Sequence, residues 1–135
     1  MIDSTTGKAL LRLARWTLER WCADEPWNDG GPGLVAAMDR PIDGLFVTLN
    51  IGLELRGCIG TVDRHDSLDA ILREMAVKAA GSDPRFAPLS ADELDRTTIS
   101  LSLLTPPEPL ADTEEIVIGR DGLILEKGGR RGLFL

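Results

Sequence analysis

The chain is poor in the residues that build metal centres and disulfide frameworks. Its 135 residues include two cysteines and one histidine. A tetrahedral zinc site needs clustered nitrogen and sulfur ligands, so we expect no metal. Cys22 and Cys58 lie in different sequence contexts, which argues against a disulfide and favours reduced thiols. The segment Thr6-Gly7-Lys8 lacks the upstream glycine and the following hydroxyl residue of a phosphate loop, and we expect no cofactor.

The chain also lacks a basic excess and long apolar runs. Its net charge of -7 and pI near 4.7 argue against binding to nucleic acids or anionic membranes. No apolar run approaches the roughly 20 residues that span a bilayer. The N-terminal residues have neither the basic nor the apolar region of a signal peptide. The composition therefore predicts a cytoplasmic protein of one globular domain.

Two segments have the spacing of amphipathic helices. Apolar residues recur at helical intervals between Thr5 and Cys22. The predicted buried stripe of this helix is Leu10, Ala14, Thr17, Leu18 and Trp21. A second helix is expected to follow a cap at Asp66 or Ser67 and to end near Ala80. Its predicted buried stripe is Leu68, Ile71, Leu72, Met75, Ala76 and Ala79.

The segments Gly44–Asn50 and Leu53–Thr61 predict a β-hairpin. A two-residue loop would mix charged and apolar residues on one face, so we favour the three-residue loop 50–52 with Gly52 in the left-handed conformation. This register places Phe46 opposite Arg56 and Gly44 opposite Cys58. The predicted buried face is Leu45, Val47, Leu49, Leu53, Leu55 and Ile59.

The remaining segments complete a mixed fold. Ser90 and Glu93 have capping-box spacing, which predicts a short helical turn. Residues 98–105 alternate as a half-buried strand does. Residues 122–135 predict a second hairpin, with Glu126 opposite Arg131. We therefore predict an α+β fold, a mostly antiparallel β-sheet with two main helices packed against it.

The most distinctive segment is Leu55-Arg56-Gly57-Cys58-Ile59-Gly60, or LRGCIG. Two glycines in a strand indicate a bulge or a close approach to the backbone. Together with the segment from Asp83 to Leu89, the strand 99–104 and the ending 122–135, it resembles the AMMECR domain family. The resemblance spans nearly the whole chain and implies that residues 1–135 form a single AMMECR-like domain.

The resemblance also implies a longer chain and certain partners. Family members usually continue past Leu135 into a proline and a further helical segment, so this chain is either naturally short or a fragment. In both cases we expect exposed apolar groups at residues 132–135 and a homodimer through them. Related domains are fused to, or encoded beside, Memo-like and radical-SAM proteins, which the resemblance implies as partners.

Cys58 is the candidate catalytic residue. A nearby cation makes a thiol more nucleophilic, and Arg56 lies on the same predicted face. Arg56 is also suited to holding a carboxylate or phosphate. Against this, free cysteine commonly packs as a small hydrophobe. His65 is the only histidine available as a base, but a histidine in a surface turn is far more often simply solvated.

Two functions of different classes remain. The first is a non-catalytic interaction or accessory module with a ligand or partner site around LRGCIG. The second is a thiol-dependent enzyme, or a component of one, that acts on a small anionic substrate at Arg56 and Cys58. We favour the module, because no base, metal set or cofactor loop accompanies the cysteine. The residues expected to form the binding site are Phe46, Arg56, Gly57, Gly60, Arg85 and Phe86.

Overall fold

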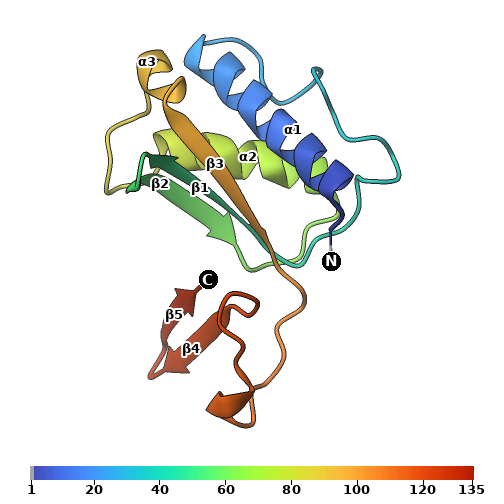
Figure 1. Ribbon diagram of the computed structural model, residues 1–135, viewed down its shortest axis with the longest axis vertical. Coiled ribbons are helices and arrows are strands. Elements are labelled where there is room, and N and C mark those ends of the chain that lie inside the picture. Colours follow the sequence, from blue (N-terminus) through green and yellow to red (C-terminus); the bar gives the residue numbers. More distant parts are fainter. Residues whose placement is uncertain (1) are drawn as a thin grey trace. The chain divides into compact units, whose positions relative to one another are not determined.

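The computed structural model describes residues 2–135, which divide into two compact units. One unit ends at Thr105 and the other covers Pro106–Leu135. Figure 1 shows the helices and strands of each unit, coloured along the sequence. Helices and antiparallel strands together confirm the predicted α+β class. Within the described residues, no helix is both long enough and apolar enough to span a membrane.

The helices of the first unit follow the predicted stripes and caps. Helix α1 (Ser4–Cys22) is capped by Asp3, and it buries Leu13 in addition to most of the expected stripe, while Trp21 is only half-buried. Helix α2 (Leu68–Gly81) is capped by Ser67, and all six residues of its expected stripe are buried. Helix α3 (Ala91–Leu94) begins with the predicted capping box.

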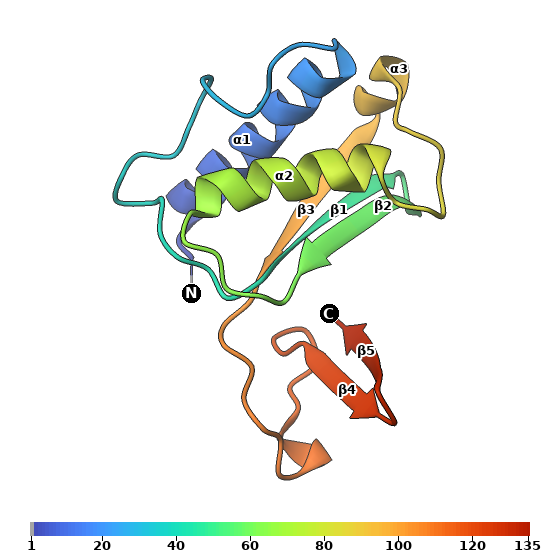
Figure 2. The same ribbon diagram turned by 180° about the vertical axis from the view of Figure 1, so that it is seen from behind.

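Three antiparallel strands form the sheet of the first unit. Strands β1 (Leu45–Ile51), β2 (Glu54–Thr61) and β3 (Thr97–Leu103) lie in the order β2-β1-β3. Figures 1 and 2 show α1 and α2 on the same face of this sheet. The core between helices and sheet contains the fully buried β1 residues Leu45, Val47 and Leu49. Phe46, Thr48 and Cys58 lie on the opposite face, as predicted.

The predicted register of the first hairpin is wrong. The chain turns at Gly52 and Leu53, so that Ile51 pairs with Glu54, and a bulge then shifts the pairing beside Leu49 and Asn50. The bulge inserts one extra residue in β2, which restores the separation of apolar and polar faces without the three-residue loop. Gly52 has the left-handed conformation that the sequence predicts, with a φ of 59°.

The later turn changes the partners of the site residues. Cys58 lies opposite Thr48 instead of Gly44, and Phe46 lies opposite Gly60 instead of Arg56. The expected burial of Leu53 and Leu55 is also wrong, because they are 105% and 39% exposed. Both residues precede the bulge. The alternation of side chains that points Ile59 toward the core begins only after the bulge.

The second unit is a small two-stranded sheet. Strands β4 (Leu123–Lys127) and β5 (Arg130–Phe134) pair about Gly128 and Gly129, and Glu126 lies opposite Arg131 as predicted. Arg131 Nε donates to Glu126 Oε1 at 2.7 Å. Residues 106–135 include no buried residue, and Phe134 and Leu135 are 60% and 56% exposed. Self-association through these side chains stays a prediction.

Candidate functional site

The LRGCIG segment and the loop from Asp83 to Pro88 lie together at the β2 edge of the sheet. We call the residues that connect them the Cys58 cluster. Its members are Thr48, Arg56, Cys58, Asp83, Arg85, Phe86 and Glu93. The cluster therefore combines strand β2 with residues up to 37 positions away along the chain. It contains a thiol, two ion pairs and an aromatic ring.

Arg56, at the bulge of β2, is committed to a carboxylate and not to the thiol. Its Nε and Nη2 donate to the two carboxylate oxygens of Glu93 at 2.6 and 3.1 Å. The Arg56 side chain is 15% exposed and that of Glu93 is 26% exposed. The hydrogen bond from Arg56 lowers the pKa of Glu93 to about 2, and the same bond raises the pKa of Arg56. A bidentate pair of this kind fixes the orientation of the guanidinium plane.

One end of Arg56 has no such partner. Its Nη1 is buried and has no hydrogen-bond partner among residues 2–135. Buried polar atoms are nearly always satisfied, so this nitrogen marks a place where a water or a ligand group would be accommodated favourably.

Asp83 joins the loop to the edge of β2. Its carboxylate accepts the backbone N–H of Cys58 at 3.0 Å and the Nε and Nη2 groups of Arg85 at 3.0 and 2.8 Å. The Asp83 side chain is only 2% exposed. These bonds, with that from Arg85 the strongest, hold its pKa well below the usual range. Asp83 therefore binds both the side chain of Arg85 and the backbone of β2.

Phe86 lies between the two ion pairs in the contact network. The guanidinium carbons of Arg56 and Arg85 lie 5.8 and 5.5 Å from the centre of its ring. These distances are within the range of cation–π contact. The loop residues Arg85 and Phe86 thus border the LRGCIG segment, as the sequence predicts, and Arg85 is the more accessible of the two arginines, at 56% exposure.

The thiol of Cys58 has a hydroxyl neighbour. Its Sγ lies 3.3 Å from Thr48 Oγ1, and Cys58 is half-buried. The hydrogen bond to Asp83 raises the pKa of Arg85. Arg85 and the backbone N–H of Cys58 both donate to the Asp83 carboxylate, so Arg85 is joined to this residue through Asp83, whereas the sequence pointed to Arg56. The 27-residue separation and the intervening helix hid this neighbour from sequence reasoning.

The two glycines of the segment have clear packing reasons. A Cβ atom at Gly57 would lie 2.2 Å from the backbone oxygen of Ala79, so helix α2 packs directly on this glycine. A Cβ atom at Gly60 would lie 2.3 Å from Phe46 Cγ, so the ring of Phe46 covers the backbone there. The close approach to the backbone predicted from these glycines is made by the protein itself at both positions.

The other sequence candidates lie apart from this chemistry. The His65 ring contacts Thr61 Oγ1 at 3.4 Å, and its backbone pairs with that of Ile42. Residues 2–135 show no hydrogen bond between His65 and Cys58. Within the same part of the chain, no group of three metal-ligating side chains occurs. Burial raises the pKa of the Cys22 thiol, which packs beside the core.

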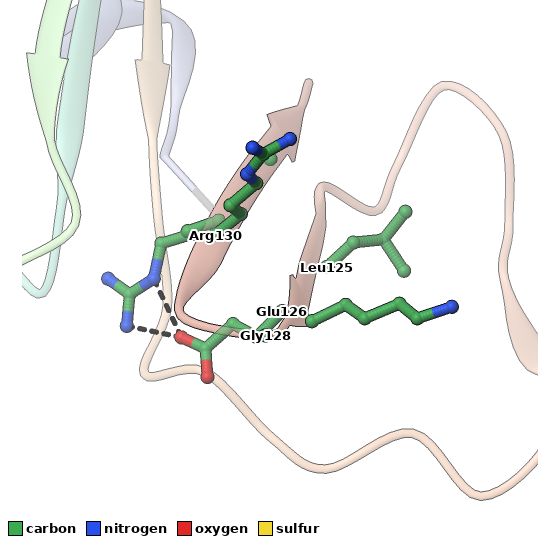
Figure 3. Close-up of a pocket in the computed structure, with 7 residues that line it drawn as sticks. Leu125, Glu126, Gly128 and Arg130 are labelled. Atoms are coloured by element: carbon green, nitrogen blue, oxygen red, sulfur yellow. Dashed lines mark hydrogen bonds and ion pairs between the residues drawn. The ribbon is translucent and has the colours of Figure 1, made fainter.

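A hollow on the second hairpin contains none of the predicted site residues. It has a volume of about 510 Å³. Figure 3 shows Leu125, Glu126 and Arg130 at its lining, and Glu126 forms an ion pair with Arg131. Gly128 and Gly132 are among its lining residues, and the hollow is open to solvent. We therefore place the candidate site at the Cys58 cluster, where charged and reactive groups meet.

Comparison with known proteins shows the family to which the chain is similar. The family model described as AMMECR1 matches residues 11–135. A protein of Thermococcus gammatolerans is 41% identical over 99% of this chain and 70% of its own length. A protein of Methanothermobacter thermautotrophicus is 40% identical over 96% of this chain and 70% of its own length.

A solved structure is also similar. The crystal structure of the uncharacterized protein PH0010 from Pyrococcus horikoshii matches with a TM-score of 0.81 and 36% identity. The match covers 99% of this chain and 70% of that chain. Sequence and structure comparisons thus lead to the same conclusion: this chain belongs to the AMMECR1 family.

Proposed function

We propose that this domain is a non-catalytic binding module whose recognition surface is the Cys58 cluster. The observation that carries the proposal is the bidentate pair of Arg56 with Glu93. In this pair Arg56, the cation nearest in sequence to the thiol, is bound to a carboxylate and helps to define the shape of the site. A nucleophilic thiol needs a free cation or a base beside it, and the charges around Cys58 are already paired.

The outer members of the cluster suit recognition. Arg85 is more than half exposed and Phe86 is half-buried beside it. Arginine and aromatic side chains contribute strongly to protein interfaces when they are held rigidly. Asp83 and the stacked ring hold Arg85 in one orientation, which lowers the entropy lost on binding. By family association, the partners to be tested first are Memo-like and radical-SAM proteins.

The test is a binding measurement with four variants. Purified Memo-like and radical-SAM proteins from the source organism are titrated against the wild-type domain by calorimetry. Arg85→Glu and Phe86→Ala should each weaken binding at least tenfold, whereas Cys58→Ser should leave it within about twofold, because the module does not use the thiol. Arg64→Glu, which changes another exposed arginine, is the matched control and should bind normally. Equal loss in all four variants, or loss in Cys58→Ser alone, would contradict the module.

A thiol-dependent enzyme is the second candidate function. The Asp83 carboxylate, which joins Arg85 to the backbone of Cys58, and the Thr48 hydroxyl beside the sulfur favour it. In this case Arg85 would hold the anionic group of a small substrate beside the sulfur. Covalent labelling of Cys58 that a small carboxylate or phosphate ester blocks, and that Arg85→Ala abolishes, would support the enzyme over the module.

A further inference from the structure

The two edges of the three-stranded sheet differ in whether their outward backbone groups are covered. At the β2 edge, the Asp83 carboxylate accepts the outward N–H of Cys58 at 3.0 Å. This side chain occupies the place where the backbone of an added strand would bind. Proteins commonly protect exposed strand edges in this way. Among residues 2–135, the β3 edge has such a side-chain partner only at Thr97, whose carbonyl oxygen accepts from Arg15.

The pairing pattern shows which β3 groups face outward. Because the N–H of Cys58 points away from β1, the pair of Cys58 with Thr48 is a non-hydrogen-bonded one, and Thr48 directs its backbone toward β3. Ser100, opposite Thr48, therefore faces β1, and its neighbours Ile99 and Leu101 face the free edge. Arg15 Nη2 donates to Thr97 O at 2.6 Å, which confirms this alternation.

Arg15 occupies only the first residue of this edge. In the part of the chain that the structure describes, the outward backbone groups of Ile99 and Leu101 have no strand beside them, because β3 is the last strand of the sheet. The outer-face side chains Thr98 and Ser100 are exposed, while Ile99 and Leu101 are partly buried against the core. The edge thus presents backbone donors and acceptors that are free to pair with another strand. One face of β3 beside this edge is apolar, and the other face carries hydroxyl groups.

Helix α1 adds positive charge along the same edge. Figures 1 and 2 show α1 beside β3 and running in the opposite direction. Lys8 and Arg12 lie seven and three residues before Arg15, on one side of the helix, and both are exposed. Neither forms an ion pair with any residue between 2 and 135. Leu11, in the same turn, is 39% exposed. In a chain of net charge -7, this is a local basic border.

We propose that the free edge of β3 binds an extended acidic segment of a protein partner by strand addition. The segment pairs its backbone with Ile99 and Leu101. Its alternate side chains on the helix side carry carboxylates toward Lys8 and Arg12, and those on the other side lie beside Thr98 and Ser100. Strand addition is an established mode of peptide recognition, in which backbone bonds give affinity and alternate side chains give specificity. The surface is distinct from the Cys58 cluster and does not depend on its function.

The test uses the peptide acetyl-TEVEVET-amide, whose glutamates share one face. Amide NMR spectra of the whole chain are recorded during titration, together with hydrogen exchange. We expect saturable shifts and slowed exchange at the amides of Ile99 and Leu101. Lys8→Gln and Arg12→Gln should each weaken binding by about two- to fivefold, as expected for exposed charge pairs. Lys78→Gln, an equal change of charge on α2, should leave binding unchanged.

Two further peptides and the free protein make the result decisive. The lysine version, acetyl-TKVKVKT-amide, and a fully N-methylated TEVEVET peptide should not bind. The proposal is overturned if the acidic peptide gives no saturable shifts at millimolar concentration, or if the lysine version binds equally. It is also overturned if the largest shifts fall at Cys58 and Phe86. Exchange at Ile99 and Leu101 that slows with protein concentration alone would assign the edge to a second copy and refute the acidic partner.

Discussion

Replacement of Asp83 by alanine tests the connection between the loop and β2. The carboxylate is 2% exposed and accepts the Cys58 N–H, which has no other acceptor in the described chain. Leaving a buried donor unsatisfied costs about 1–3 kcal/mol. Arg85 is more than half exposed, so the loss of its ion pair adds little. The expected loss in the free energy of unfolding is therefore about 1–3 kcal/mol.

The assay combines urea unfolding with amide hydrogen exchange. Asp83→Ala should lower the unfolding midpoint and speed exchange at the Cys58 amide, while the amide protection of α2 should fall only through the global loss of stability. Asp83→Asn keeps an acceptor oxygen and should lose less. Glu54→Ala removes an exposed carboxylate from the same strand and is the control. Unchanged stability and unchanged exchange at Cys58 in Asp83→Ala would refute the role we give to this bond.

The remaining predictions concern acid stability, packing and self-association. The pKa of Glu93 lies near 2 in the folded protein, whereas its ordinary value is 4.5, so its pair with Arg56 stabilises the fold above pH 4.5. This contribution is lost as the pH drops toward 2. Glu93→Gln should therefore make the stability depend less on pH in that window, as measured by thermal melting. Gly57→Ala should destabilise the fold by about 1–3 kcal/mol, because its Cβ would meet Ala79 O, whereas Gly7→Ala, which has open space in a helix, should be neutral or stabilising in the same denaturation assay. We also propose a homodimer through residues 132–135; Phe134→Glu should then give a monomer by light scattering, and a wild-type monomer at high concentration would exclude the dimer.

The helices and the faces of the first hairpin were predictable because they depend on local patterns. The stripes of α1 and α2 follow from apolar spacing, and the cap of α2 at Ser67 follows from the short polar residues before that helix, whereas the cap of α1 at Asp3 was not predicted. The turn at Gly52 was found, but its partner strand was misaligned. A bulge changes the register by one residue without leaving a clear signal in the sequence, and the two glycines pointed to its neighbourhood only.

The candidate site was predicted as a location but not as a network. Arg85 and Phe86 were placed beside LRGCIG through the family resemblance, whereas the pair of Arg56 with Glu93 was missed. The capping box of α3 already explained Glu93 from the sequence, so the sequence indicated no second partner. The structure shows that Glu93 binds both Ser90 and Arg56. Contacts across tens of residues depend on how α2 and its following loop return to β2. A pattern in one sequence does not contain that information.

The central claim is that Arg56 shapes the site through Glu93 and does not activate Cys58. The most direct measurement is the rate of alkylation of Cys58 at pH 7, followed by mass spectrometry, in the wild type, Arg56→Ala and Glu93→Gln. Circular dichroism verifies that each variant is folded, and Cys22 is the internal reference. The account predicts that both variants lose stability while their Cys58 rates stay within about twofold of the wild type, because Arg56 is bound to Glu93 and the neighbour of the sulfur is the Thr48 hydroxyl. A rate that falls about tenfold in Arg56→Ala and rises in Glu93→Gln, where Arg56 is released, would show an activated thiol and contradict the account.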